Sequence, residues 1–314
     1  MKVRLYGFEL EAEAKSVSIE SLMTYFIDRN GEPDNSGSLE RRIFVDSTTN
    51  KNYHLGLVVT VKDQKRFCRL EDSRGQIRIT VENLTGSDKL MEFNFFVLNR
   101  KNGLGLYQHY HQSCGLTVFG GYLVSHYNVI RERLANNEID EARRHEPSLS
   151  KSKESGIRKK HRGKLIFSQL VRKDSLEKML LDFKKLKAFE YELSALGADV
   201  RAGIPLGQYV RKYREKLTFG RTWGVSVLAP AIAKAVGDLN PTSGRVHAVN
   251  ELDEDVSLRI FNMPDNFGEE DFDEVALKLH NLDLKSFATH KVVNELVAHC
   301  ESDELRHIFQ ANVR

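Results

Sequence analysis

The side chains with the clearest chemical potential in this 314-residue chain are cations gathered in its middle. Residues 143–173 hold eleven Lys or Arg against two Glu, although the whole chain carries a net charge of only +3. Such a segment gains most beside a polyanion, because each neutralised phosphate releases condensed counterions. A solvated linker could have this composition, but Leu165, Ile166 and Phe167 are apolar anchors that a linker would not need. The pattern favours nucleic-acid binding, with these phosphate contacts: Arg158, Lys159, Lys160, Arg162 and Lys164.

A second group of cations follows within residues 201–221. We expect a helix over residues 206–217, on which Tyr209 and Tyr213 alternate with basic side chains that suit phosphate and sugar contacts. An ordinary solvated face of an amphipathic helix is the alternative. The candidate contacts in this group are Arg211, Lys212 and Arg214.

The only tryptophan of the chain, Trp223, follows Arg221 and Thr222. Packing in the core is the usual role of such a side chain, and stacking on a nucleic-acid base is the alternative. The surrounding residues 222–228 have the composition of a buried strand.

The best candidates for metal ligands are His109, His111 and Cys114, since zinc accepts imidazole and thiolate ligands. If this segment is a strand, both imidazoles share one face, and such alternation is more common on an exposed strand than at a metal site. No His-Glu-x-x-His run and no Gly-x-x-x-x-Gly-Lys-Ser/Thr loop occur in the sequence. We therefore expect no cofactor and no metal.

A metal-dependent nuclease is the enzymatic alternative. It would use Glu190 and Glu192, with Asp199 nearby, to hold Mg²⁺ and activate water. Two carboxylates two residues apart on a strand more often form a solvated sheet face. We expect no catalytic residues, and keep the nuclease open as the alternative.

The composition favours a cytoplasmic protein. Hydrophobic residues make up 40% and charged residues 29% of the chain, and the mean hydropathy is −0.43. No apolar run approaches the roughly 20 residues needed to cross a bilayer, and the N-terminus lacks the features of a secretion signal. The three cysteines are far apart and odd in number, which suits a reducing compartment.

The hydrophobic periodicity predicts an α+β fold, with a mainly antiparallel sheet in the N-terminal half and mixed helix and strand in the C-terminal half. Six strand-like runs between residues 41 and 110 are separated by turns without an intervening helix, and a helix is expected over residues 116–137. Further helices are expected over residues 174–187 and 284–310. We divide the chain into a sheet-rich domain (1–140), a basic connector (141–173) and an α+β domain (174–314).

The order of these features resembles a known family. A sheet ending in MEFNFFVLNRKNGLGLYQHYHQSCGLTVFGGYL precedes the cationic stretch, and LTFGRTWGVSVLAPAIAKAVGDL and VSLRIFN follow it. This layout resembles the phage-exclusion proteins of the lambda RexA type and the B component of the Kiwa defence system. The resemblance implies a cytoplasmic, dimeric protein that binds DNA with little sequence preference and senses phage infection. It assigns no role to any single residue.

We therefore expect a nucleic-acid-binding protein that acts in antiphage defence, with DNA or RNA as its partner. A homo-oligomer without membrane insertion is expected, and a second protein of the defence system is a possible partner. A third hypothesis is an assembly subunit whose basic connector docks an acidic protein.

Overall fold

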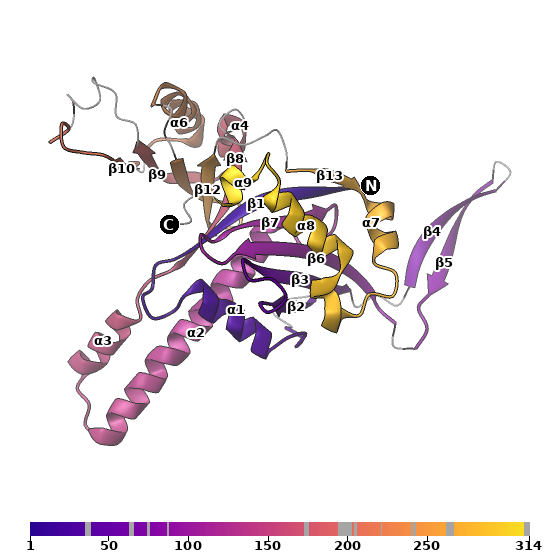
Figure 1. The fold of residues 1–314 in the computed structure, drawn as a ribbon, viewed down its shortest axis with the longest axis horizontal. Coiled ribbons are helices and arrows are strands. Elements are labelled where there is room, and N and C mark those ends of the chain that lie inside the picture. Colours follow the sequence, from indigo (N-terminus) through magenta and orange to yellow (C-terminus); the bar gives the residue numbers. More distant parts are fainter. Residues whose placement is uncertain are drawn as a thin grey trace.

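The protein is built around one large sheet (Figure 1). The computed structural model describes residues 1–34, 39–62, 66–73, 76–86, 88–172, 176–193, 203, 206–220, 222–239, 241, 243–261 and 267–310. Among these residues the sheet has eleven strands, in the order β10-β9-β11-β12-β8-β1-β7-β6-β3-β2, with β13 pairing to β1. All these pairs are antiparallel except β8 with β12, so the α+β class is confirmed and the sheet is mixed.

The described residues form the following strands and helices, labelled as in Figure 1. The strands are β1 (Lys2–Ala12), β2 (Glu40–Asp46), β3 (Tyr53–Lys62), β4 (Arg66–Ser73), β5 (Gln76–Asn83), β6 (Leu90–Asn99), β7 (Leu104–Tyr110), β8 (Leu165–Arg172), β9 (Lys185–Leu193), β10 (Tyr213–Thr218), β11 (Ser243–Val249), β12 (Asp255–Phe261) and β13 (Glu269–Asp271). The helices are α1 (Ile19–Asp28), α2 (Leu116–His145), α3 (Lys151–Lys160), α4 (Leu176–Leu181), α6 (Val225–Leu239), α7 (Phe272–Lys278), η2 (Leu284–Thr289), α8 (Lys291–Glu301) and α9 (Arg306–Phe309).

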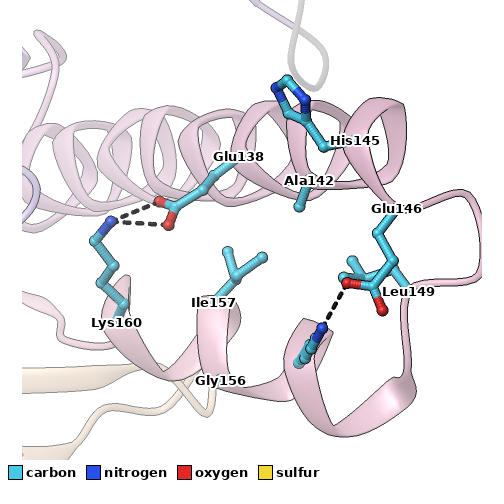
Figure 2. Close-up of a pocket in the computed structure, with 9 residues that line it drawn as sticks. Glu138, Ala142, His145, Glu146, Leu149, Gly156, Ile157 and Lys160 are labelled. Carbon is cyan, nitrogen blue, oxygen red and sulfur yellow. Dashed lines mark hydrogen bonds and ion pairs between the residues drawn. The ribbon is translucent and has the colours of Figure 1, made fainter.

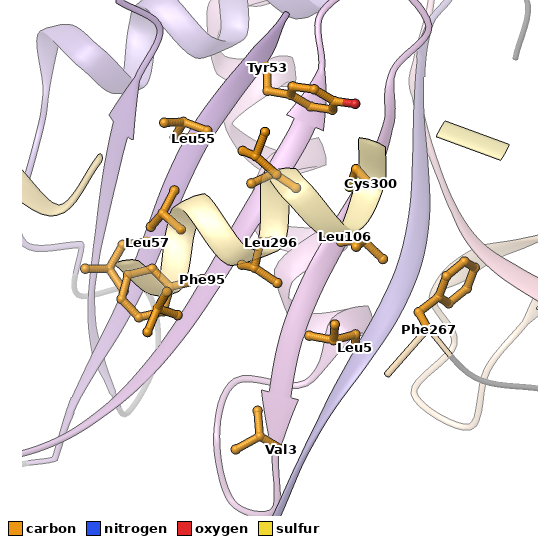
Figure 3. Packing of buried hydrophobic residues seen from close by; sticks show 14 of the residues in the cluster. Val3, Leu5, Tyr53, Leu55, Leu57, Phe95, Leu106, Phe267, Leu296 and Cys300 are labelled. Atoms are coloured by element: carbon orange, nitrogen blue, oxygen red, sulfur yellow. The ribbon is translucent and has the colours of Figure 1, made fainter. Parts of the chain in front are cut away.

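Helices cover the sheet on two sides because its strands alternate their apolar side chains. On β1, Val3 and Leu5 pack into a core beneath η2, α7, α8 and α9 (Figure 3). Phe8 and Leu10 point to the opposite face and pack with α1 and α2. A third core lies between α4, α6 and the C-terminal strands. Val171 of β8 belongs to this third core, so α4 and α6 lie on the same side of the sheet as α2.

Two pairs of elements project from this body in Figure 1. The hairpin β4–β5 is a separate two-stranded ribbon. The C-terminal half of α2 and the antiparallel α3 form a helical arm on the opposite side. The sequence predicted α2 only to residue 137, and the helix continues to His145.

The basic connector is not a linker. Its residues complete α2, form α3 and then form β8, which lies in the middle of the sheet between β1 and β12. Phe167 packs against Phe8 at a centroid distance of 5.6 Å, so the apolar residues of the connector belong to the core. The division at residues 140 and 174 stays a prediction, although one sheet runs across both positions.

Two predictions in the C-terminal half were wrong, and a third was correct only in part. The predicted helix over 206–217 contains the strand β10, whose cationic and other side chains alternate with period two. The predicted strand over 222–228 contains the start of α6, which buries Leu228, Ile232 and Val236 at helical spacing. The predicted helix over 174–187 ends at Leu181, and β9 begins at Lys185.

The final helix is also not continuous. Its predicted span over 284–310 is divided into η2, α8 and α9. His290 caps α8 by accepting the N–H of Val292 at 3.3 Å, which ends one element and begins the next. In the described part of the chain, none of the helices combines the length and apolar character required to cross a membrane.

Candidate nucleic-acid interface

The five phosphate contacts predicted in the first cationic group lie on α3 and on the turn that leads from it to β8. Ser150 caps α3 by accepting the N–H of Lys153, and this explains why the helix begins after the Pro147–Ser150 turn. None of the residues of α3 is buried, so the helix is not held by a hydrophobic core of its own. Its position depends on contacts with α2, in which the half-buried Ile157 points toward Ala142 and polar side chains join the two helices (Figure 2).

Ion pairs fix α3 against α2. Lys160 donates to both carboxylate oxygens of Glu138, at 2.8 and 2.9 Å, and Lys153 donates to Glu146 at 2.5 Å (Figure 2). Arg143 of α2 pairs with Glu154 of α3. Hydrogen bonds from Lys160 and then His161 lower the pKa of Glu138. Lys160 therefore helps to hold the arm together, and its contact with phosphate stays a prediction.

In the part of the chain that the structure describes, the other four predicted contacts form no ion pair with α2. Arg158 donates only to the neutral side chain of Asn136, at 3.4 Å. Within the described residues, the exposed side chains of Lys159, Arg162 and Lys164 have no acidic partner. These four cations at the end of α3 and in the turn after it are here called the α3 edge: Arg158, Lys159, Arg162 and Lys164.

The turn after α3 is locked to the body of the protein. Gly163 has φ +133° and lies so close to Ala14 that an added Cβ would meet its backbone N at 2.3 Å, so only glycine fits there. Arg131 of α2 donates to the Gly163 carbonyl at 3.1 Å. The backbone N–H of Lys164 donates to Glu13 of the segment after β1 at 3.3 Å. The α3 edge is therefore presented by a rigid connection to the sheet.

The second cationic group lies on β10, at one edge of the sheet, and its cations face carboxylates. Lys212 pairs with Glu192 at 2.9 Å. Arg214 and Lys216 pair with Glu190 at 3.0 and 2.6 Å. Arg211 is exposed in the segment before the strand, and Arg201 and Arg221 lie outside the described residues.

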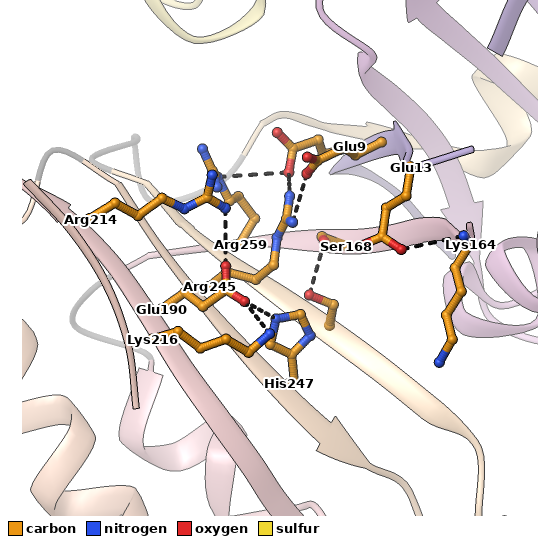
Figure 4. A network of polar contacts seen from close by, with 12 residues as sticks. Glu9, Glu13, Lys164, Ser168, Glu190, Arg214, Lys216, Arg245, His247 and Arg259 are labelled. Carbon is orange, nitrogen blue, oxygen red and sulfur yellow. Dashed lines mark hydrogen bonds and ion pairs between the residues drawn. The ribbon is translucent and has the colours of Figure 1, made fainter. Parts of the chain in front are cut away.

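The carboxylates suggested for a nuclease site are thus occupied by these cations. Burial favours the neutral acid of Glu190, but hydrogen bonds from Lys216 and Arg214 outweigh it and lower its pKa to about 2. His247 contributes a further contact at 3.1 Å (Figure 4). Binding of Mg²⁺ at Glu190 would require these partners to leave, and Asp199 lies outside the described residues.

A network of charges continues from Glu190 across the polar face of the sheet, shown in Figure 4. The Arg245 guanidinium of β11, only 3% exposed, donates to Glu9 and contacts Glu11 of β1, each at 2.7 Å. Between these strands lie the small, buried Ser168 and Ser257, whose hydroxyls are 3.0 Å apart. Small residues at these two positions leave room for the Arg245 bridge to pass over β8 and β12.

The candidate zinc ligands are not arranged as a site. Cys114 is buried, and burial raises the pKa of its thiol. His109 contacts the ring of Tyr6, with centroids 5.6 Å apart and the two ring planes tilted at 54°. Over the described ranges of the chain, no three His, Cys, Asp or Glu side chains gather in a way that could hold a metal ion.

Comparison with known proteins adds no family. No protein-family model matches this chain, and no curated protein matches it. The candidate interface therefore depends on the geometry described above.

Sequence reasoning missed the polar network across the sheet. Neither the cationic runs nor the candidate carboxylates of the sequence analysis include Arg245 or Arg259, which lie on β11 and β12. The alternation of Arg245 and His247 on β11, and of Ser257 and Arg259 on β12, was the available signal that these strands have one polar face.

Proposed function

We propose that the protein binds nucleic acid through the α3 edge, by contacts with backbone phosphates. The observation that carries this proposal is the combination of charge and rigidity. Residues 151–164 hold seven Lys or Arg against one Glu, and the inward-facing cations are paired with α2, whereas Lys159, Arg162 and Lys164 face solvent. A held row of cations loses little conformational entropy on binding a phosphate backbone.

Binding of this kind is weakly selective for sequence and sensitive to salt, because phosphate contacts position a nucleic acid without reading its bases. DNA is the proposed ligand, and we place the protein in the cytoplasm as a homo-oligomer that serves antiphage defence. The layout shared with the phage-exclusion proteins supports the defence role, and a second defence-system protein remains a candidate partner.

The test is charge reversal of the α3 edge in the full chain. The variant Lys159→Glu, Arg162→Glu, Lys164→Glu leaves the Lys160–Glu138 and Lys153–Glu146 pairs in place, so the fold should be retained. We expect at least a hundredfold loss of duplex DNA affinity at low salt, and a salt dependence of log K shallower by about 3, since three phosphate contacts are removed. Fluorescence anisotropy with a labelled duplex measures both quantities.

The matched control reverses three exposed lysines elsewhere that have no acidic partner within the described residues: Lys51, Lys178 and Lys285. It changes the net charge by the same amount, so an equal loss of affinity in the control would mean that overall charge, not the α3 edge, governs binding. Wild-type affinity in the α3-edge variant would contradict the proposal. Competition by poly-glutamate as strong as that by DNA would favour an acidic protein partner instead.

A further inference from the structure

Two aromatic side chains near the edge strand β10 remain largely in water. Trp223, the only tryptophan of the chain, is 61% exposed, and Tyr209 is 82% exposed. Such large aromatic side chains are usually well buried, because their burial stabilises a fold strongly. An exposed aromatic side chain next to a strand that carries cations is an arrangement that proteins use to bind single-stranded nucleic acid, with a base stacked on the ring.

The backbone holds Trp223 just beyond one end of β10. The Phe219 N–H donates to the Lys187 carbonyl at 3.0 Å and extends the pairing of β10 with β9. The Trp223 N–H then donates to the Gly220 carbonyl at 3.5 Å, which closes a turn before α6. Tyr209 precedes the strand, so the two aromatic residues flank β10 at its opposite ends.

Cations occupy the strand between these aromatic residues. Arg214 and Lys216 are two residues apart, so they share one face of the strand at a spacing of about 7 Å. Their side chains are 59% and 57% exposed although both contact Glu190, which leaves part of each cation open to a ligand. An extended edge strand with cations on one face and an aromatic residue at its end suits a single strand, whose bases are not held in a duplex.

We propose that β10 and Trp223 form a binding site for single-stranded nucleic acid, in which Trp223 stacks on an unpaired base and Arg214 and Lys216 contact the adjacent phosphates. This inference rests on the proposed nucleic-acid function and extends it. Duplex binding at the α3 edge needs no aromatic side chain, whereas this second site does.

Because the chain has a single tryptophan, its fluorescence reports directly on the environment of Trp223. Full-length protein is titrated with an oligonucleotide of about 12 thymidines, within the roughly 4–16 nucleotides that single-strand-binding folds cover. We expect saturable quenching of tryptophan fluorescence, because stacking places the indole against a base. The same titration with a uridine oligonucleotide tests whether the sugar matters, and quenching by either oligonucleotide supports the site.

Substitution gives an independent measurement. By anisotropy of a labelled oligonucleotide, Trp223→Ala should weaken single-strand binding between about 5-fold and 150-fold, and Trp223→Phe, which keeps a stacking ring, should retain most of the affinity. Leu277→Ala, which removes an exposed apolar side chain on α7, is the matched control and should bind as the wild type does. Since Trp223 is exposed, these variants should fold normally.

The experiments distinguish a failure of the α3-edge proposal from a failure of the β10 proposal. In the α3-edge variant, duplex affinity should fall while quenching by the single strand persists. Unchanged fluorescence at saturating oligonucleotide, together with wild-type single-strand affinity in Trp223→Ala, would overturn the β10 site and leave the α3 edge intact. Undiminished duplex binding by the α3-edge variant would refute the proposed function instead.

Discussion

Replacing Glu190 with Gln should destabilise the protein and strengthen its binding of nucleic acid at the same time. The Glu190 side chain is only 12% exposed and contacts Arg214, Lys216 and His247 at 3.0, 2.6 and 3.1 Å. It serves as an internal counterion for the cations that we assign to phosphate binding. Gln keeps the shape of the side chain and removes the charge, so the two roles of this carboxylate can be separated.

The loss of stability follows from the pKa of Glu190. Burial opposes ionisation, but hydrogen bonds from Lys216 and Arg214 lower the pKa from 4.5 to about 2, which corresponds to about 3 kcal/mol in favour of the native carboxylate. Because the folded pKa lies below the unfolded one, this contribution is complete above about pH 5 and is lost as the pH falls toward 2. The destabilisation of Glu190→Gln should therefore be at most about 3 kcal/mol at pH 7 and should shrink in acid.

The gain in affinity follows from the released cations. A unit charge about 4 Å from another contributes about 1 kcal/mol in water, so removing the competing carboxylate should raise single-strand affinity about fivefold at low salt. The salt dependence of log K should become steeper by about 1 to 2. Denaturant unfolding at pH 7 and pH 3 measures stability, and anisotropy across a salt series measures binding.

Glu304→Gln is the control, because Glu304 is exposed and the substitution changes the net charge by the same amount. If Glu190→Gln binds no more tightly than the wild type, or if Glu304→Gln gains as much affinity, the carboxylate does not compete with phosphate and the reasoning is refuted.

Further predictions concern the supports of the two binding surfaces. Gly120→Ala should destabilise the protein by about 1–3 kcal/mol in denaturant unfolding, because an added Cβ would lie 2.5 Å from Phe167 of β8. An added Cβ at the neighbouring Gly121 would have nothing within 4 Å, so Gly121→Ala should stabilise α2 by about 0.5–1 kcal/mol. Equal effects of the two substitutions would contradict the packing of α2 on β8. Arg245→Met should cost about 3–5 kcal/mol, because Glu9 loses its main partner in a largely buried site, and adding Glu9→Gln should recover part of that loss. No recovery in the double variant would show that the bridge is not the source of the effect.

The N-terminal half of the fold could be predicted because its signals are local. The alternation of apolar residues in β1, β3 and β6 and the turns between strands lie within single short segments. The start of α1 is likewise encoded locally, because Ser18 and Ser21, three residues apart, form its capping box. The strands β3 and β6 lie close to strand-like runs that the sequence predicts between residues 41 and 110.

The structure of the middle of the chain was harder to predict, because its many charged residues indicate an exposed segment although part of it is buried. β8 follows a cationic helix, and the sequence marks Leu165 and Phe167 as apolar anchors without indicating that they belong to a strand in the middle of the sheet. Nothing near β8 in sequence indicates that it pairs in parallel with β12, since Ser168 and its partner Ser257 are 89 residues apart. Parallel pairing between distant segments leaves little trace in a single sequence.

For the candidate site, the composition of the sequence could be interpreted, but the positions of the side chains in the fold could not. The sequence identified which cations are numerous, but not which of them are already paired. Lys160 and Lys212 belong to the runs that attracted attention, yet each has a carboxylate partner, on α2 and β9 respectively. Lys159 and Arg162 belong to the same α3 run as Lys160 but face solvent. Which cations can reach a phosphate is therefore decided by the helix and strand faces on which they lie, and charge reversal of paired and unpaired cations should separate the loss of fold from the loss of binding.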